Sequence, residues 1–210
     1  IDVMIQFIKR INEEYDYEIE GLDLGGGLGI AYVKEEEPPT IESFAKLTCT
    51  AVKELCAHYG VKEPRIAVEP GRSIAATPGV TLYTVGILKT LPGIRNIVAI
   101  DGGMSDNIRT ALYGAEYESV IANKANQPRT KVVTLVGKHC ESGDAVAADA
   151  SIQNPDLGDI VCMFGTGAYC HSMSSRYNGQ PRPGIVFVED GKARLVTRRE
   201  SYADLMSCDL

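Results

Sequence analysis

Apolar residues recur at intervals of three and four positions at the start of the chain. Ile1, Met4, Ile5, Ile8 and Ile11 would lie on one face of an α-helix. No capping residue or turn precedes this pattern. We therefore predict an amphipathic helix and expect the sequence to begin inside it.

A second helical pattern lies between Thr40 and Gly60. Thr is a common N-cap residue, and Gly commonly ends helices because it tolerates the left-handed conformation. The spacing of the apolar residues between them predicts an amphipathic helix that packs on a core. The residues of this face are Ile41, Phe44, Ala45, Thr48, Ala51, Val52, Leu55 and Tyr59.

Two short apolar segments, residues 17–24 and 65–68, predict strands, and each runs directly into a loop. The first loop is Gly25 to Gly29, and the second is Glu69 to Arg72. Because a helix separates the strands, this order is typical of a β/α fold with parallel strands. A complete (β/α)8 barrel needs about 250 residues. We therefore expect only the last units of a TIM-type barrel, within residues 1–75.

Beyond Ser73 the pattern changes to repeated β-rich runs, which predict a second, all-β domain over residues 76–210, either a β-barrel or a sandwich. Glu189-Asp190-Gly191 has the composition of a hairpin turn. Residues 201–210 predict a closing helix. The predicted strands are residues 80–88, 97–100, 120–122, 131–136, 160–163, 184–188 and 193–196.

Composition narrows the class of protein. Of the 210 residues, 44% are hydrophobic and 23% are charged, as in ordinary globular proteins with a core of their own. The apolar runs stop well short of the ~20 residues of a membrane span, and no signal sequence opens the chain. We therefore expect a cytoplasmic protein that does not bind membranes.

The net charge and the cysteines argue against a nucleic-acid-binding protein and against a disulfide-rich or metal-binding one. The formal net charge is −7 and the Lys and Arg residues are scattered, so no basic surface for nucleic acid is predicted. The six cysteines show neither CxxC pairs nor zinc-finger spacing. We expect reduced thiols rather than a disulfide framework, and no metal site.

Two loops have features of a site for an anionic cofactor. Consecutive glycines after a strand let several N–H groups point at one place, as a phosphate needs. Gly25 to Gly29 lacks the spacing of a dinucleotide-binding loop or a P-loop. Glu69 and Arg72 flank a Pro-Gly bend at the end of the next strand, the edge that carries barrel active sites. A tight turn and a surface ion pair are the alternatives, but together the loops suit a phosphate and a protonated ring nitrogen.

Six motifs stand out along the sequence: Gly25 to Ile30, Glu69 to Ser73, Asp101 to Arg109, Tyr113, His139 to Asp144 and Gly167 to Tyr169. They follow one another in the order found in the diaminopimelate decarboxylases. On these motifs the sequence resembles the carboxyl-terminal half of this pyridoxal-phosphate-dependent family, over nearly its whole length.

The resemblance implies pyridoxal 5'-phosphate as cofactor. Glu69 would pair with the pyridinium nitrogen and so deepen the electron sink. Arg72 would be shared between the phosphate and the substrate, and Tyr169 would hydrogen-bond the phosphate and approach the substrate. The cofactor-binding residues that the family implies are Gly26, Gly27, Glu69, Pro70, Gly71, Arg72 and Tyr169.

The resemblance also implies a reaction, the decarboxylation of meso-diaminopimelate to L-lysine in lysine biosynthesis. Arg109 and Tyr113 would bind a substrate carboxylate, for which the guanidinium fork is suited. Cys140 would be the catalytic acid that returns a proton after carbon dioxide leaves, and Glu141 would recognise the distal amino group. In the family this loop reaches the neighbouring subunit, so we expect a homodimer with shared active sites. The implied substrate-binding residues are Arg72, Arg109, Tyr113, Glu141 and Tyr169.

The sequence departs from the family in two respects. The lysine that holds the cofactor, in a Tyr-Ala-x-Lys-Ala-Asn-like motif, and the ring-stacking histidine are both absent. Ala122 to Asn126 looks similar to the lysine motif, but it follows a predicted strand of the β domain, where we expect an exposed loop, so Lys124 is given no such role. We expect a fragment that is inactive alone. The alternatives are a relative acting on ornithine, arginine or another basic amino acid, and a non-catalytic homologue that binds a partner.

Overall fold

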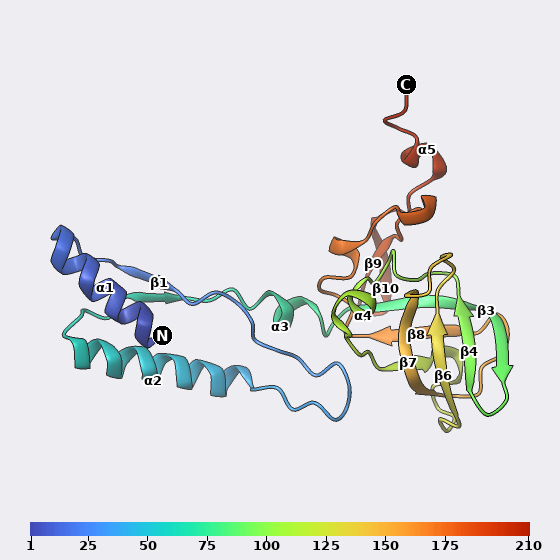
Figure 1. Cartoon of the computed structure of the whole chain (residues 1–210), viewed down its shortest axis with the longest axis horizontal. Helices are drawn as coiled ribbons and strands as arrows, with labels where there is room; N and C mark the ends of the chain where they lie inside the picture. Colours follow the sequence, from blue (N-terminus) through green and yellow to red (C-terminus); the bar gives the residue numbers. More distant parts are fainter. The chain divides into compact units, whose positions relative to one another are not determined.

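The computed structural model describes all 210 residues, which form two compact units. The first unit comprises Ile1–Ala31 and Glu35–Ile74, and the second comprises Tyr32–Lys34 and Ala75–Leu210. Figure 1 shows the long helices of the first unit and the mixed sheet of the second.

Helices α1 (Asp2–Tyr15) and α2 (Ile41–Tyr59) form the first unit with the two strands, so both predicted helices are confirmed. Thr40 caps α2, because its Oγ1 accepts a hydrogen bond from the Ser43 N–H at 3.1 Å. Gly60 ends α2 in the left-handed conformation, with φ 66°. The core of this unit contains Ile5, Ile8, Leu22, Val52 and Cys56.

Strands β1 (Gly21–Asp23) and β2 (Arg65–Ala67) pair in parallel, with Leu22 opposite Ile66. The predicted parallel β/α order is confirmed. Both strands are shorter than predicted.

Six strands of the second unit form one mixed sheet in the order β5-β8-β3-β4-β6-β7. Strands β4 and β6 are parallel, and the other neighbours are antiparallel. The predicted all-β region is thus confirmed. The strands are β3 (Val80–Leu91), β4 (Arg95–Ile100), β5 (Ser119–Ile121), β6 (Lys131–Val136), β7 (Ala145–Ile152) and β8 (Ile160–Phe164).

The two edge strands of this sheet, β5 and β7, lie close enough to be bridged. The Ile121 N–H donates to the buried Oε1 of Gln153, which directly follows β7, at 2.8 Å. The sheet is therefore nearly closed into a barrel around its apolar core. The largest fully buried side chains of this core are Val85, Val98, Ile121, Leu135, Val146, Ile152, Val161 and Met163.

Strand β7 was not predicted from the sequence. It contains four alanines, a residue with weak strand propensity. It forms because it pairs with β6 and buries Val146 and Ile152 against the core.

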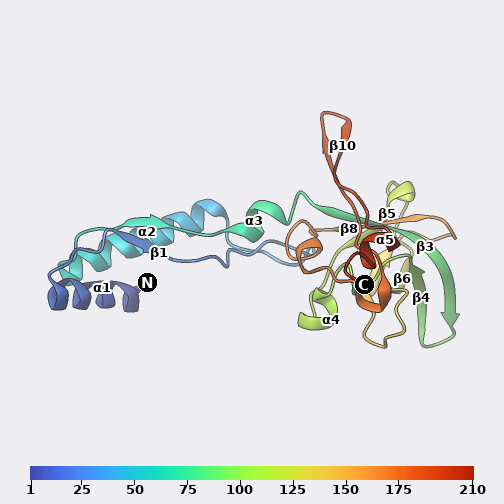
Figure 2. The same ribbon diagram turned by 90° about the horizontal axis from the view of Figure 1, so that it is seen from above.

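A hairpin of β9 (Ile185–Glu189) and β10 (Lys192–Thr197) follows, drawn apart from the six-stranded sheet in Figure 2. Its turn residues Asp190 and Gly191 both have positive φ, 50° and 72°, as a type I′ turn requires, so the predicted turn is confirmed.

The closing helix α5 (Tyr202–Leu205) is shorter than predicted. No helix in the chain combines the length and apolar character needed to cross a bilayer.

Short helices lie between the strands, and α3 and α4 carry residues predicted for the site. They are α3 (Gly71–Ala75), α4 (Arg109–Tyr113) and the 3-10 helices Ala122–Lys124, His171–Met173 and Tyr177–Gly179.

Candidate functional site

The glycine loop after β1 lies directly against the Glu69 loop after β2. The Glu69 N–H donates to the Gly25 carbonyl at 2.8 Å, which continues the parallel pairing of the strands beyond their ends. A Cβ atom on Gly26 would lie 2.6 Å from the Glu69 carbonyl oxygen. Only glycine fits at this contact, and the structure thus brings the two loops predicted from the sequence together.

The glycine loop has the backbone geometry of an anion site. Gly25 and Gly27 have φ of 71° and 98°, and no other atom would lie within 4 Å of a Cβ at either position. Asp23 fixes the start of the loop, because its Oδ1 accepts from the Gly25 N–H at 2.8 Å. Alternating positive φ values of this kind direct successive N–H groups toward one anion. With the exposed carboxylate of Glu69 beside it, this donor and acceptor set fits a phosphorylated pyridinium ring.

The bend at Pro70 and Gly71 leads from β2 into α3. The Pro70 carbonyl accepts hydrogen bonds from the Ser73 hydroxyl at 2.9 Å and the Ile74 N–H at 3.2 Å. The half-buried Arg72 lies in this helix, two residues beyond Pro70. These hydrogen bonds close the turn between Glu69 and α3 and so fix the backbone position of Arg72 within the helix.

In the second unit, the guanidinium of Arg109 lies among tyrosine rings. It is buried at the start of α4, and its Nη1 donates to the hydroxyl groups of Tyr32 at 3.0 Å and Tyr117 at 2.7 Å. The rings of Tyr113 and Tyr169 also face it, at 6.0 and 5.8 Å from the guanidinium carbon. The structure thus brings together three residues singled out from the sequence.

Two partners of Arg109, Tyr32 and Tyr117, were not predicted as site residues. Their rings pack edge to face, with centroids 5.2 Å apart. Burial raises the pKa of Tyr117 well above its usual value, so its hydroxyl remains protonated at neutral pH. Because both Nη1 hydrogens are occupied by these tyrosines, the Nε and Nη2 donors of Arg109 remain for an acceptor from outside the protein.

The loop that contains Cys140 and Glu141 is anchored at both ends by Asp144. The buried Asp144 carboxylate accepts from the backbone N–H groups of Met104 and His139, at 2.6 and 2.8 Å. It also lies 2.9 Å from Nδ1 of His139. These bonds tie the loop to the segment after β4, which leads into Arg109.

Cys140 and Glu141 themselves are exposed at the tip of this loop. Glu141 accepts a hydrogen bond from the Tyr177 hydroxyl at 3.2 Å. It also lines a cavity of about 290 Å³, whose other lining residues are Met104, Ile108, Ser175 and Tyr177. The loop therefore presents a thiol and a carboxylate beside a partly apolar cavity.

Other chemically notable residues have structural environments. Cys162 and Cys170 are buried, and burial raises the pKa of each thiol. Lys124 was expected in an exposed loop, but this was wrong: only 16% of its side chain is exposed, and its ammonium binds Asp156 and Asp159 in an ion-pair cluster.

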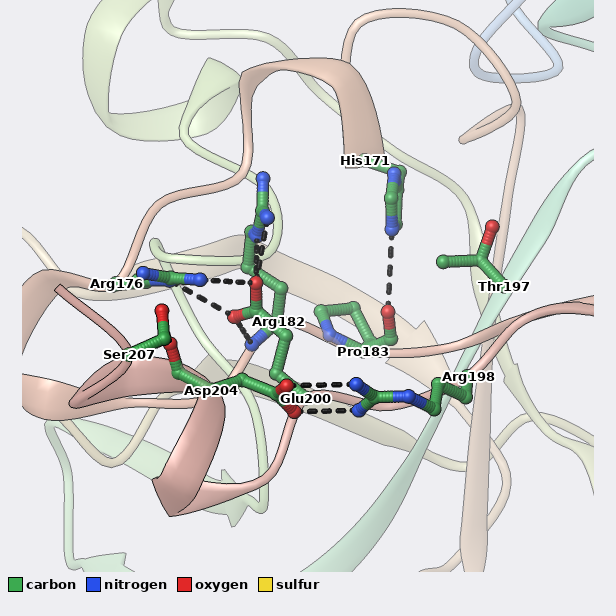
Figure 3. Close-up of a pocket in the computed structure, with 9 residues that line it drawn as sticks. All are labelled: His171, Arg176, Arg182, Pro183, Thr197, Arg198, Glu200, Asp204 and Ser207. Carbon is green, nitrogen blue, oxygen red and sulfur yellow. Dashed lines mark hydrogen bonds and ion pairs between the residues drawn. The ribbon is translucent and has the colours of Figure 1, made fainter.

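A second hollow, of about 320 Å³, lies beside the carboxyl-terminal segment and is lined by paired charges (Figure 3). Arg176 and Arg182 both bind Glu200, with nitrogen to oxygen distances of 2.9 and 2.6 Å, and lower the pKa of Glu200 to about 2. Arg198 binds Asp204 in the same way, which lowers the pKa of that carboxyl. Since every guanidinium already has a carboxylate partner, we interpret this cluster as a structural tie.

Comparison with known proteins agrees with these features. The family model for the pyridoxal-dependent decarboxylase C-terminal sheet domain matches residues 31–167. The diaminopimelate decarboxylase of Bacillus subtilis (strain 168) is 45% identical over 208 residues, which cover 98% of this chain and 47% of that protein. The chain therefore spans about half the length of the curated relatives it matches.

Solved structures give the same relationship. Diaminopimelate decarboxylase from M. jannaschii in complex with L-lysine has a TM-score of 0.88 and 34% identity, and the match covers all of this chain and 47% of that one. Lysine/ornithine decarboxylase from Vibrio vulnificus has a TM-score of 0.67 at 20% identity over 85% of this chain and 46% of that one, which is a likeness of fold alone. Because the family model covers more than half of the sequence, the chain belongs to the pyridoxal-dependent decarboxylases and contains their carboxyl-terminal sheet domain.

Proposed function

We propose that this chain is the carboxyl-terminal half of a diaminopimelate decarboxylase, a carboxy-lyase that converts meso-2,6-diaminopimelate into L-lysine and carbon dioxide. The observation that carries the proposal is the buried Arg109, held through Nη1 by two tyrosines with Nε and Nη2 left for a ligand. A solved relative, 34% identical, was crystallised with L-lysine, the expected product.

The residues that would hold pyridoxal 5'-phosphate are those whose geometry suits it. Backbone N–H groups of Gly26 and Gly27 would bind the phosphate, and the Pro70-Gly71 bend would place Glu69 at the ring nitrogen. Arg72 and Tyr169 would complete the phosphate contacts. When bound, the cofactor supplies an electron sink for the electron pair left behind as carbon dioxide departs.

The substrate would be held at its carboxylate by Arg109. Its two remaining nitrogens present parallel N–H donors, which is the geometry of bidentate carboxylate binding. Tyr113 and Tyr169, whose rings face the guanidinium, would exclude water from this pair and so strengthen it. Arg72 would also contact the substrate.

The proton that replaces carbon dioxide would come from Cys140. Its thiol is exposed at the loop tip, so it is accessible to a ligand. The neighbouring carboxylate of Glu141 would accept hydrogen bonds from the distal ammonium of the substrate. Because one exposed loop supplies both groups, it supports a homodimer in which each loop completes the other subunit's active site. The enzyme would be cytoplasmic and would act in lysine biosynthesis.

The test is an assay of the full-length protein that contains this chain, loaded with pyridoxal 5'-phosphate. Carbon dioxide and amine products would be measured separately with meso-diaminopimelate, L-ornithine and L-arginine. We expect L-lysine from diaminopimelate alone. Release from ornithine or arginine but not from diaminopimelate would indicate a related decarboxylase. No release from any of the three would indicate a non-catalytic homologue.

A further inference from the structure

Tyr177 connects the Cys140-Glu141 loop to a later segment of the chain through two different contacts. Its hydroxyl donates to Oε2 of Glu141 at 3.2 Å. Its ring stacks on the imidazole of His139, with centroids 5.8 Å apart and an interplanar angle of 13°. One side chain thus contacts residues on both sides of Cys140.

His139 is a fixed platform for this ring. Its side chain has no exposed surface, and Asp144 holds both its backbone N–H and its Nδ1. Its Nε2 is buried without a hydrogen-bond partner. The imidazole therefore cannot turn without displacing Asp144, which also binds the backbone of Met104.

Glu141, by contrast, has few contacts that fix the position of its side chain. Residues 140–143 are all exposed, and the Tyr177 hydroxyl is the hydrogen-bond partner of its carboxylate. That bond occupies Oε2 and leaves Oε1 for a donor from outside the protein. An exposed glutamate without such a bond would sample several rotamers.

The cavity next to this carboxylate has two kinds of lining. Met104 and Ile108 supply apolar surface, whereas Glu141 and the hydroxyls of Ser175 and Tyr177 are polar. An aliphatic chain that ends in an ammonium group would match both. The orientation of Glu141 then determines whether the ammonium meets its acceptor.

We propose that Tyr177 is a positioning residue that sets the orientation of Glu141, using the buried His139 as its support. The inference rests on the proposed function, because it concerns the group that would bind the distal ammonium of the substrate. Tyr177 acts through Glu141 and takes no part in proton transfer.

The first test compares steady-state kinetics of full-length enzymes with meso-diaminopimelate. Tyr177→Phe keeps the ring on His139 and removes only the hydroxyl, so KM is expected to rise about three- to tenfold, with kcat changed less than about twofold. Tyr202→Phe, which removes a hydroxyl from a tyrosine that is 70% exposed, is the matched control and should leave both constants unchanged. An unchanged KM for Tyr177→Phe would overturn the proposal.

A double-mutant cycle separates positioning from a general effect on folding. If Tyr177 acts only through Glu141, the double variant Tyr177→Phe/Glu141→Ala will have the KM of Glu141→Ala alone. Additive increases in KM would mean that the hydroxyl has another role and would contradict the inference.

Hydrogen–deuterium exchange provides a readout that does not depend on activity. Tyr177→Leu, which removes the ring that stacks on His139, should increase exchange in the segment that carries it, residues 175–180, and leave strand β8 unchanged, and Tyr177→Phe should not increase it. If exchange were the same in wild type and Tyr177→Leu, this would overturn the inference that His139 supports Tyr177. If the wild-type enzyme does not decarboxylate diaminopimelate, the proposed function fails, whereas the exchange experiment still decides whether His139 supports Tyr177.

Discussion

The Asp144 carboxylate accepts a 2.6 Å hydrogen bond from the backbone N–H of Met104, forty residues earlier in the chain. The same buried carboxylate holds the backbone and the ring of His139. One acidic side chain thereby connects the segment before Arg109 to the loop that contains Cys140. The two residues have separate proposed roles, but the positions of both depend on the Asp144 carboxylate.

Removal of this anchor should be strongly destabilising. Asp144→Ala would leave two backbone donors and a histidine nitrogen buried without their acceptor, so we expect the free energy of unfolding to fall by about 3–5 kcal/mol. Urea unfolding followed by circular dichroism measures this. Asp209→Ala, at an exposed position near the end of the chain, is the control and should change stability by less than about 0.5 kcal/mol. A loss of stability at Asp144 no larger than the control's would contradict the anchoring role.

A methyl group on Gly26 should weaken cofactor binding. The added Cβ would lie 2.6 Å from the backbone oxygen of Glu69, so the two loops must separate to accept it. We expect Gly26→Ala to weaken the affinity of the full-length protein for pyridoxal 5'-phosphate at least about tenfold, as measured by absorbance titration. Gly21→Ala, where a Cβ meets nothing within 4 Å, is the control. Equal affinities for the two variants would show that the contact between the loops does not matter for the cofactor.

The elements that the sequence predicted well are those set by local signals. Helix α2 has its capping residue, its apolar face and its terminal glycine within one short segment. The hairpin turn at Asp190 and Gly191 is likewise encoded in two adjacent residues. Strand β7, rich in alanine, depends on its pairing with β6 and has no local signal of comparable strength.

The same distinction applies to the candidate site. Gly26 and Glu69 lie in short motifs, so their contact follows once two parallel neighbouring strands are assumed. Tyr32 was missed because it binds Arg109 across 77 residues of sequence, and no local pattern distinguishes it from other tyrosines. Such long-range partners become visible only in the folded chain.

Arg109 should not be replaceable by lysine. An ammonium group cannot bind two tyrosine hydroxyls and at the same time present a parallel pair of donors to a carboxylate. We expect Arg109→Lys to lower kcat/KM of the full-length enzyme for diaminopimelate about 10- to 100-fold. Arg194→Lys, at an exposed arginine over the ring of Phe187, should leave kcat/KM unchanged. Wild-type kinetics for Arg109→Lys would rule out a bidentate role.

Glu200 should contribute to stability in a way that depends on pH. Arg182 and Arg176 hydrogen-bond its carboxylate and lower its pKa from the usual value of 4.5 to about 2. A carboxyl group whose pKa is lowered on folding contributes stability that is complete above the unfolded pKa and is lost as pH falls toward the folded pKa. The contribution of Glu200 is therefore present at pH 6 and declines between about pH 4.5 and pH 2.

Glu200→Gln removes this titration while keeping the size of the side chain. In guanidinium unfolding experiments, the wild type should be more stable than the variant at pH 6, and more than roughly half of that difference should be lost at pH 3, because Glu200 of the unfolded chain is then mostly protonated and folding must release that proton. Glu116→Gln, at an exposed carboxylate, should follow the wild type at both pH values. If the difference between wild type and Glu200→Gln were the same at pH 6 and pH 3, the arginine pair would not be lowering the pKa of Glu200, and the cluster would stabilise the carboxyl-terminal segment by packing instead.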